Sequence, residues 1–252
     1  KETRLDQLED ERETALEYSS LPAYYETSPA ERERINAVVA QRLGKPQEAV
    51  TKRDWQEADT SGKVGSLVAV TLETGMIPIE IKHASVDWYN PRKQVIVIPK
   101  KYAAKNRPTT ELPLTDDTAD VLSEWMRERR HLSAYDNTTR LWLNQRENPY
   151  TSGNLCYLVR QLCREAGIHI EDRKVVWYSL RHNLGHTFEE VADISATKDQ
   201  LRHQYLETTK NIYGETATEK RRYTLEAIND TAEEAATNDT YNPYKPDVDR
   251  TI

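Results

Sequence analysis

Four segments of this chain carry residue types that can bind an oxyanion, move a proton or act as a nucleophile. A planar guanidinium group meets two phosphate oxygens at once, and a lysine can donate a proton to a leaving oxygen. A tyrosine hydroxyl, with a pKa of about 10, attacks phosphorus when a base or a cationic neighbourhood assists it. Such a set suits a phosphodiester, whose non-bridging oxygens gather negative charge during attack. In chain order the segments are residues 72–80 (LETGMIPIE), 98–113 (IPKKYAAKNRPTTELP), 177–182 (WYSLRH) and 200–214 (QLRHQYLETTKNIYG).

Taken in order, the four segments resemble the catalytic domain of the tyrosine recombinases, the phage integrase family, in the variant common among haloarchaeal integrases. The first is similar to the family's Thr-Gly-hydrophobic-Arg-x-x-Glu helix start, and the second to the hairpin whose turn carries a lysine. The third resembles His-x-x-Arg-His, and the fourth resembles the ending with Leu-Gly-His, Thr-Thr and Tyr. One such segment is a weak signal, but four in order over roughly residues 60–230 are a strong one.

The resemblance implies a role for each matched residue. Tyr213 is expected to attack the DNA phosphate and to form a 3′-phosphotyrosyl link. Arg181 is expected to bind that phosphate, and Lys105 to protonate the leaving 5′ oxygen. His203 is expected to make a second phosphate contact, and His182 to assist proton transfer at the nucleophile. No metal or other cofactor is implied, because cationic side chains hold the phosphate, and the sequence has no ligand cluster that contradicts this.

Three features depart from the family pattern. Ile77 stands where the family has its first arginine, and its side chain offers a phosphate neither charge nor hydrogen bond. Losing one charged donor costs a few kcal/mol of transition-state stabilisation, on the order of hundreds-fold in rate. Tyr178 replaces the first His of the third motif, a change familiar in haloarchaeal forms, and one extra residue separates His203 from Tyr213. Nearby cations that could partly substitute are Lys82, His83 and Arg107.

Each assignment also has a structural alternative. Lys105 can be a solvated lysine close to two others, and its place between two predicted strands is what favours a functional role. Arg181 and His182 can cap or pair inside a helical bundle. Tyr213 is one of 14 tyrosines, and the competing candidates are Tyr205 and Tyr223. Tyr213 is favoured because two arginines follow it at the spacing of haloarchaeal relatives, Arg221 and Arg222.

The elements that must position these residues can be read from the apolar pattern. A helix is predicted from Ser28, which can cap it, to the stop at Gly44, and residues 1–20 are interpreted as a solvated helix or an entering linker. The apolar residues 64–74 end at Gly75, before a short helix that opens near residue 78. The pattern is helical again from residue 115, and two or three further helices are predicted within residues 178–231.

Between these helices, residues 86–89 and 94–99 are predicted as strands, and residues 110–114 as a third strand in which Pro113 suits an edge. Strands segregated from helices favour an α+β fold, namely the mostly helical tyrosine-recombinase catalytic fold with a small three-stranded antiparallel sheet. The predicted organisation is an N-terminal helical segment or linker (1–50), a catalytic domain (51–231) and a C-terminal tail (232–252). The first 50 residues are too short for the helical clamp that precedes the family's catalytic domain, and the sequence leaves open whether such a domain has been trimmed.

The composition limits the function classes. A net charge of −7 argues against nucleic-acid binding by the whole surface but leaves room for a local basic face. No apolar run reaches the roughly 18 residues that a membrane-spanning helix needs, and the charged first residues indicate that a secretory signal is absent or already removed. Cys156 and Cys163 lie two helical turns apart, too far for a disulfide, so they are interpreted as core thiols of an intracellular protein.

The sequence therefore predicts a site-specific recombinase of a virus or mobile element. It is expected to act inside the cell as a homo-oligomer on double-stranded DNA attachment sites, without a membrane partner. Ile77 motivates an alternative, a recombinase-fold DNA-binding protein that has lost efficient catalysis. A helical structural protein without a DNA role is a third and weaker alternative.

Overall fold

The computed structural model describes residues 4–103, 108–171, 174–191 and 194–202 of the chain. Its helices are α1 (Arg4–Glu17), α2 (Pro29–Leu43), α3 (Lys52–Glu57), α4 (Gly62–Thr74), α5 (Pro78–His83), α6 (Asp116–Arg129), α7 (Ser152–Glu165), α8 (Tyr178–Val191) and α9 (Ile194–Gln200). Its strands are β1 (Tyr89–Asn90), β2 (Val95–Ile98) and β3 (Thr110–Pro113), which form an antiparallel sheet in the order β1-β2-β3. The predicted α+β fold, mostly helical with a small three-stranded antiparallel sheet, is confirmed.

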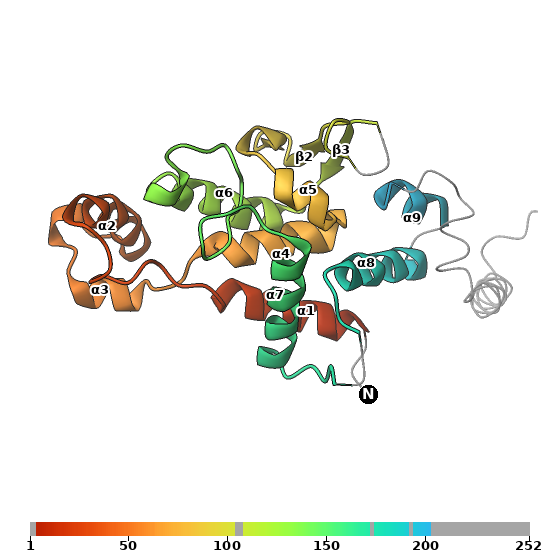
Figure 1. The fold of residues 1–252 in the computed structure, drawn as a ribbon, viewed down its shortest axis with the longest axis horizontal. Helices are drawn as coiled ribbons and strands as arrows, with labels where there is room; N and C mark the ends of the chain where they lie inside the picture. Colours follow the sequence, from red (N-terminus) through yellow and green to blue (C-terminus); the bar gives the residue numbers. More distant parts are fainter. Residues whose placement is uncertain (1–3, 104–107, 172–173, 192–193, 203–252) are drawn as a thin grey trace, which may run out of the picture.

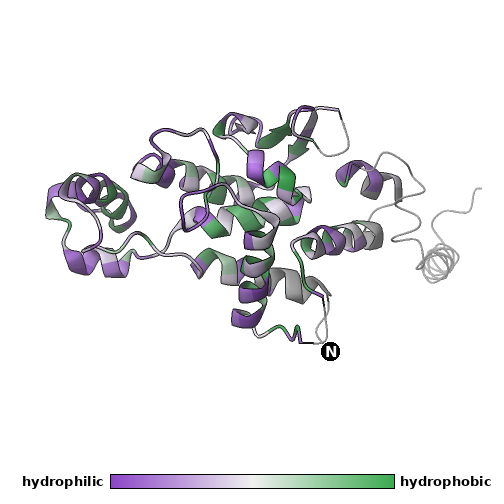
Figure 2. Ribbon diagram, in the orientation of Figure 1, coloured by the Kyte–Doolittle hydropathy of each residue, from purple (hydrophilic) through white to green (hydrophobic). Residues whose placement is uncertain are grey.

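Helix α4 is the centre of the main core. Helices α1 and α6 pack along it, α2 and α3 lie at one end of the molecule, and α8 and α9 lie at the other (Figure 1). Ser61 caps its first turn, and its buried side chains include Val64, Leu67, Val68 and Val70. In Figure 2 the hydrophobic colour gathers on α4 and β2, whereas α3 is largely hydrophilic. An apolar helix covered on several sides is a buried helix, which is why the others arrange around it.

Helix α1 belongs to this main core. Ala15 is fully buried, and a Cβ added at Gly65 of α4 would lie 2.9 Å from Leu16 Cδ2, so the two helices approach closely there. The interpretation of residues 1–20 as a helix is confirmed for Arg4–Glu17, but this helix packs against α4 and is not simply solvated.

A second, smaller core joins α2 and α3. Trp55 packs there with the buried side chains of Leu21, Ile35, Val39 and Ala58, and its Nε1 donates to Asn36 Oδ1 at 2.7 Å. The predicted caps of α2 are confirmed: Ser28 Oγ accepts from the Glu31 amide at 3.2 Å, and Gly44 ends the helix.

Glu128 joins the small core to the main one. Its carboxylate, on α6, accepts from Arg42 of α2 at 2.8 Å and from the Ser61 hydroxyl at 2.6 Å. It also accepts from the Gly62 amide at 2.9 Å, so this buried carboxylate satisfies one of the open backbone amides at the N-terminus of α4.

The sheet is smaller than the sequence predicts. Ile96 and Ile98 of β2 are buried on the core side, and Pro113 lies in β3, an edge strand of the sheet, where a missing amide is tolerated. The prediction of a strand over residues 86–89 is wrong at its start, because Val86–Trp88 form a 3₁₀ turn and β1 keeps Tyr89–Asn90 alone. The cause is local, since Ser85 Oγ accepts from the Asp87 amide and curls the backbone before the strand begins.

Helix α7 carries the two cysteines. Thr151 caps it, with its Oγ1 accepting from the Asn154 amide at 3.2 Å, and its inner face buries Leu155, Leu158, Val159 and Leu162. Cys163 is buried and Cys156 is half-buried, and no disulfide joins the pair within this helix. The interpretation as core thiols therefore holds fully for Cys163 and in part for Cys156.

Gly75 ends α4 and lets α8 approach. Its backbone is left-handed, with φ +62°, a conformation that side chains with a Cβ disfavour. A Cβ added there would also lie 3.3 Å from each of three carbon atoms, in Arg181, Leu184 and Leu201. The predicted helix stop is confirmed, and the same glycine provides the space in which the end of α4 meets α8.

Gly75→Ala should therefore lower the free energy of unfolding by more than the cost of placing an alanine in a left-handed backbone conformation. Gly44→Ala is the matched control, because Gly44 has the same backbone conformation, φ +61°, and open space around its Cβ position. The control should lose about 1–2 kcal/mol of unfolding free energy, and Gly75→Ala at least about 1 kcal/mol more from overpacking. Urea unfolding of both variants measures this, and equal losses would show that the close packing at Gly75 carries no energetic weight.

Candidate functional site

Helix α8 presents three of the predicted site residues, Tyr178, Arg181 and His182. The helix starts after Trp177, whose side chain is 1% exposed, and Ser179 Oγ accepts from the Val176 amide at 3.2 Å across its first turn. Since Trp177 anchors this turn in the core, the residues one turn later face inward or along the core edge. Arg181 accordingly is 1% exposed, a rare state for an arginine.

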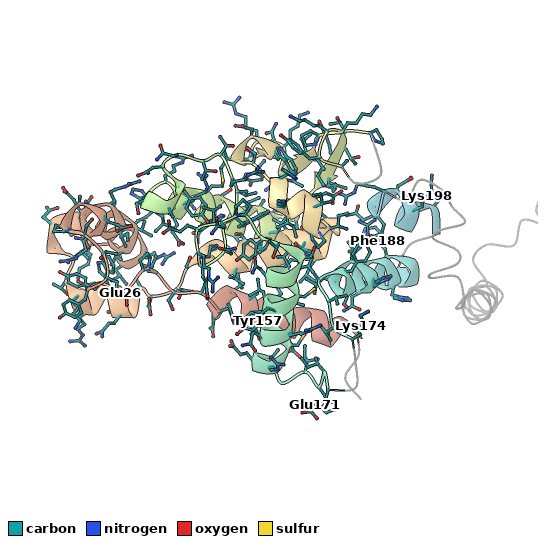
Figure 3. The ribbon with its side chains drawn as sticks, in the orientation of Figure 1. Glu26, Tyr157, Glu171, Lys174, Phe188 and Lys198 are labelled. Atoms are coloured by element: carbon teal, nitrogen blue, oxygen red, sulfur yellow. The ribbon has the colours of Figure 1, made fainter. Side chains whose placement is uncertain are left out.

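The Arg181 guanidinium joins three segments that are far apart in the sequence. Its Nη1 donates to the Gly75 carbonyl at 2.7 Å, at the turn between α4 and α5. Its Nη2 donates to the Leu201 carbonyl, just after α9. Leu201 also packs with Leu184 of α8, and Phe188, labelled in Figure 3, covers this contact. The segments predicted from the first, third and fourth motifs therefore meet at one side chain.

Ile77 lies at the start of α5, next to that turn. Its side chain is 8% exposed, and Pro78 occupies the first turn of the helix. Its amide donates to Glu80 Oε2 at 3.1 Å, so the carboxylate three residues later closes the helix start. The side chain of Glu80 is fully buried. The side chain at position 77, which the family resemblance aligns with the first arginine, is thus buried and apolar, while its backbone amide forms a local hydrogen bond.

Arg202 is a member of this cluster that sequence reasoning missed. Its Nη2 donates to Glu80 Oε2 at 2.9 Å, and the two side chains are 4% and 0% exposed. Its φ of +54° is left-handed, and it stands where the family's Leu-Gly-His motif has glycine. An arginine in place of the motif glycine was the feature of the sequence that could have drawn attention to this position. A buried ion pair is costly to desolvate and needs good geometry to persist.

Tyr178 and His182 complete the described part of the site. Tyr178 is 40% exposed. The centroid of its ring lies 5.6 Å from the centroid of the His182 ring and 6.0 Å from Arg181 Cζ. Burial lowers the pKa of His182 below its usual 6.5, and the positive charge of Arg181 lowers it further. At neutral pH the imidazole is therefore neutral, so it can accept a proton.

Three predicted site residues lie outside the described residues: Lys105, His203 and Tyr213. Lys105 falls between β2 and β3, and His203 follows directly on Arg202. The structure thus brings together Arg181, His182 and Tyr178 and places Ile77 beside them, while the positions of the other three stay predictions.

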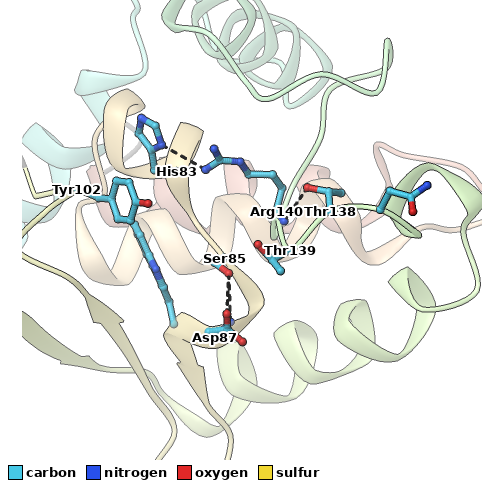
Figure 4. Close-up of a pocket in the computed structure, with 9 residues that line it drawn as sticks. His83, Ser85, Asp87, Tyr102, Thr138, Thr139 and Arg140 are labelled. Carbon is cyan, nitrogen blue, oxygen red and sulfur yellow. Dashed lines mark hydrogen bonds between the residues drawn. The ribbon is translucent and has the colours of Figure 1, made fainter.

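A separate pocket of about 540 Å³ opens at the C-terminal end of α5 (Figure 4). His83 faces it, hydrogen-bonded to Arg140 Nη1 at 3.3 Å and stacked on Tyr102 at 4.8 Å between ring centroids. Burial lowers the pKa of His83, followed by the charges of Arg140, Lys82 and Lys101. The sequence suggested His83 as a cation that could partly replace the missing arginine charge. In the structure its side chain lines this pocket and contacts Arg140 and Tyr102.

Two wider properties of the described residues bear on function. Within them, no group of three or more His, Cys, Asp or Glu side chains is arranged to hold a metal ion. In the same part of the chain, none of the helices combines the length and apolar character needed to cross a membrane.

The helices around α4, the small sheet and the arginine of α8 define the catalytic fold of a tyrosine recombinase. The sequence model of the phage integrase family matches residues 49–220, and the chain belongs to that family. No curated protein matches the chain.

Solved structures with the same fold include three recombinases. XerA recombinase is 16% identical, with a TM-score of 0.55 over 82% of this chain and 65% of that one. XerH site-specific recombinase, bound to a palindromic difH substrate, is 19% identical, with a TM-score of 0.52 over 80% and 52%. The Tn1549 transposon integrase, in complex with circular intermediate DNA, is 14% identical, with a TM-score of 0.53 over 80% and 65%. The chain thus spans less than two thirds of the length of these proteins, and the likeness is one of fold.

The lowered pKa of His182 predicts how stability depends on pH. Above about pH 6.5 the imidazole is neutral in both folded and unfolded chains; below it, the unfolded chain binds the proton more readily. Unfolding free energy should therefore fall as the pH drops from about 6.5 through the lower folded pKa. His182→Asn should flatten this slope, with the remainder due in part to His83.

Urea unfolding at about pH 7.5 and about pH 5.5 measures the slope. His169→Asn is the control, because His169 is exposed in the loop after α7. If His182→Asn and His169→Asn change the slope equally, burial beside Arg181 does not control the titration of His182.

Proposed function

We propose that this chain is the catalytic part of a site-specific DNA recombinase, an integrase that cuts and rejoins DNA through a 3′-phosphotyrosyl intermediate. The observation that carries the proposal is the buried guanidinium of Arg181, bound to backbone carbonyls of Gly75 and Leu201. Three of the four motif segments thereby meet at one group suited to a phosphate. Membership of the phage integrase family supports the same activity.

The proposed reaction uses side chains alone. Tyr213 attacks the scissile phosphorus and passes its proton to the neutral imidazole of His182. The bond from phosphorus to the 5′ oxygen breaks, and Lys105 donates the proton that this oxygen takes up. Arg181 and His203 bind the non-bridging oxygens. In rejoining, a 5′ hydroxyl attacks the phosphotyrosyl phosphorus and Tyr213 leaves with a proton, so the cycle balances without an external energy source.

The partners follow from this chemistry. We infer that the chain acts inside the cell on double-stranded DNA attachment sites, as a homo-oligomer that holds two sites together, in the integration of a virus or mobile element. The DNA bound in the XerH and Tn1549 integrase structures supports the DNA partner. Tyr178, in place of the first motif histidine, supports a relation to the haloarchaeal variant of the family.

A second candidate is a recombinase-fold protein that binds DNA without cutting it. Ile77 favours this candidate, because it removes one charged donor from the place where the family has an arginine. The two candidates share a DNA-binding surface and differ in covalent chemistry, so one experiment separates them.

Covalent capture of DNA should depend on Tyr213. The full chain is mixed with a pool of nicked duplexes of random core sequence, in which the short cleaved end diffuses away and prevents rejoining. Adducts that survive SDS are isolated, and the captured DNA is sequenced. Wild type should yield adducts with a common core sequence, and Tyr213→Phe should yield none, because a ring without its hydroxyl cannot attack phosphorus. Tyr205→Phe is the matched control and should still yield them.

Other outcomes decide between the candidates. A gel shift at low salt without any adduct from wild type would favour the DNA-binding candidate. Loss of adducts in Tyr205→Phe instead would mean that the nucleophile is misassigned. Failure to shift any duplex at low salt would contradict both candidates, since phosphate contacts dominate affinity there.

A further inference from the structure

We infer that Arg202 supplies the second guanidinium of the catalytic site and takes over the charge that is missing at position 77. The inference rests on the proposed recombinase function and names a further catalytic residue for it. Four observations carry it: a shared carboxylate oxygen, a fixed backbone, a neighbouring arginine and the identity of residue 77.

The shared oxygen places the Arg202 charge beside position 77. Glu80 Oε2 accepts from the Ile77 amide at 3.1 Å and from Arg202 Nη2 at 2.9 Å. The Arg202 nitrogen is therefore no further from the Ile77 nitrogen than two hydrogen bonds laid end to end. Arg202, two residues after the end of α9, thus brings its charge close to the backbone of Ile77, where the family has its first arginine.

The backbone before Arg202 is fixed by two contacts that come from the other motif segments. Gln200 Nε2 donates to the Glu73 carbonyl, near the end of α4. The Leu201 carbonyl accepts from Arg181 Nη2. Since residues 200 and 201 are both held, the direction of the Arg202 side chain is set, although its left-handed backbone costs free energy. A strained residue at a site of converging motifs is a functional candidate.

The contact with Glu80 suits a group that must also meet a phosphate. The ion pair joins Arg202 Nη2 to one carboxylate oxygen of Glu80, and the guanidinium that it holds is planar. A carboxylate that holds one edge fixes the plane of the group before a substrate arrives, and such preorganised charge stabilises a developing oxyanion most in a water-poor site. Arg181 binds the carbonyl of the residue before Arg202, so both arginines belong to the same cluster of motif segments.

A purely structural ion pair is the competing explanation, and loss of stability does not exclude it. Breaking a buried ion pair destabilises a protein whether or not the charge acts on a substrate. The readout must therefore respond to the charge of the phosphate. A methylphosphonate linkage serves, because a methyl group replaces one non-bridging oxygen and leaves the linkage uncharged, so cleavage needs less positive charge from the protein.

The test compares two substrates that carry the core sequence recovered from the random pool, one with a normal scissile phosphate and one with methylphosphonate. Arg202→Gln keeps a hydrogen-bond donor for Glu80 and removes the charge. On the phosphate substrate this variant should form adducts about a hundredfold more slowly than wild type. On the methylphosphonate substrate its rate should lie within about tenfold of the wild-type rate. Arg129→Gln is the matched control, because Arg129 is a buried arginine, 7% exposed, that donates to backbone carbonyls of Arg140 and Thr138. Any loss in the control should be equal on both substrates.

A second arm places an arginine at the family's position. Ile77→Arg in the Arg202→Gln background should recover at least about tenfold of the lost rate on phosphate, because the new guanidinium also reaches the catalytic phosphate. If Arg202→Gln fails to fold, Arg202→Lys replaces it. That variant keeps the ion pair and loses the fork, and its smaller loss should again shrink on methylphosphonate.

Equal losses on the two substrates, without recovery by Ile77→Arg, would overturn the assignment and leave Arg202 a structural residue. Such a result needs a wild type that forms adducts, so it leaves the recombinase function standing. Absence of adducts from wild type would instead contradict the recombinase function and, with it, a catalytic Arg202.

Discussion

The arrangement of this molecule depends on one buried guanidinium. Arg181 is almost fully removed from water and donates to two backbone carbonyls, one at the turn between α4 and α5 and one just after α9. A buried charge without water is tolerated when its donors are satisfied, and here the acceptors belong to segments more than 100 and about 20 residues away. The bond therefore sets the register between α8 and both neighbours. Gly75 is part of the same constraint, because a Cβ at that position would press on Arg181 itself.

This constraint also fixes the second buried arginine of the cluster, Arg202. The Leu201 carbonyl that Arg181 holds precedes Arg202, and Arg202 in turn binds Glu80 at the start of α5. Each contact limits the freedom of the next, so in the proposed reaction these side chains lose little further entropy on binding the phosphate. Groups fixed in this way stabilise developing charge more effectively than mobile surface cations, whose charge is screened by water and salt.

How much of this could be predicted from the sequence depends on the range of each interaction. The stop of α4 at Gly75, the cap of α2 at Ser28 and the edge position of Pro113 arise within a few residues, and local patterns predicted them correctly. The 3₁₀ turn at Val86–Trp88 was missed because a single side-chain bond from the Asp87 amide to Ser85 overrides a strand-like composition. The arginine in place of the motif glycine marked position 202, but its partner could not be assigned, since Glu80 lies 122 residues away and no periodicity links the two. The family resemblance placed Arg181 and Ile77 by position, but it cannot report which other charge reaches the same carboxylate.

Ile77 shows that the structural and chemical roles of one position are separable. The start of α5 needs a backbone amide for Glu80 and a residue compatible with the following proline, and isoleucine provides both. Its side chain is buried and contributes apolar burial to the core, and the helix start is intact. An uncharged side chain at position 77 is therefore compatible with this fold. Glu80 is fully buried and pairs with Arg202, which lies 122 residues further along the chain. The same carboxylate oxygen accepts from the Ile77 amide, a backbone contact that does not depend on the side chain at position 77.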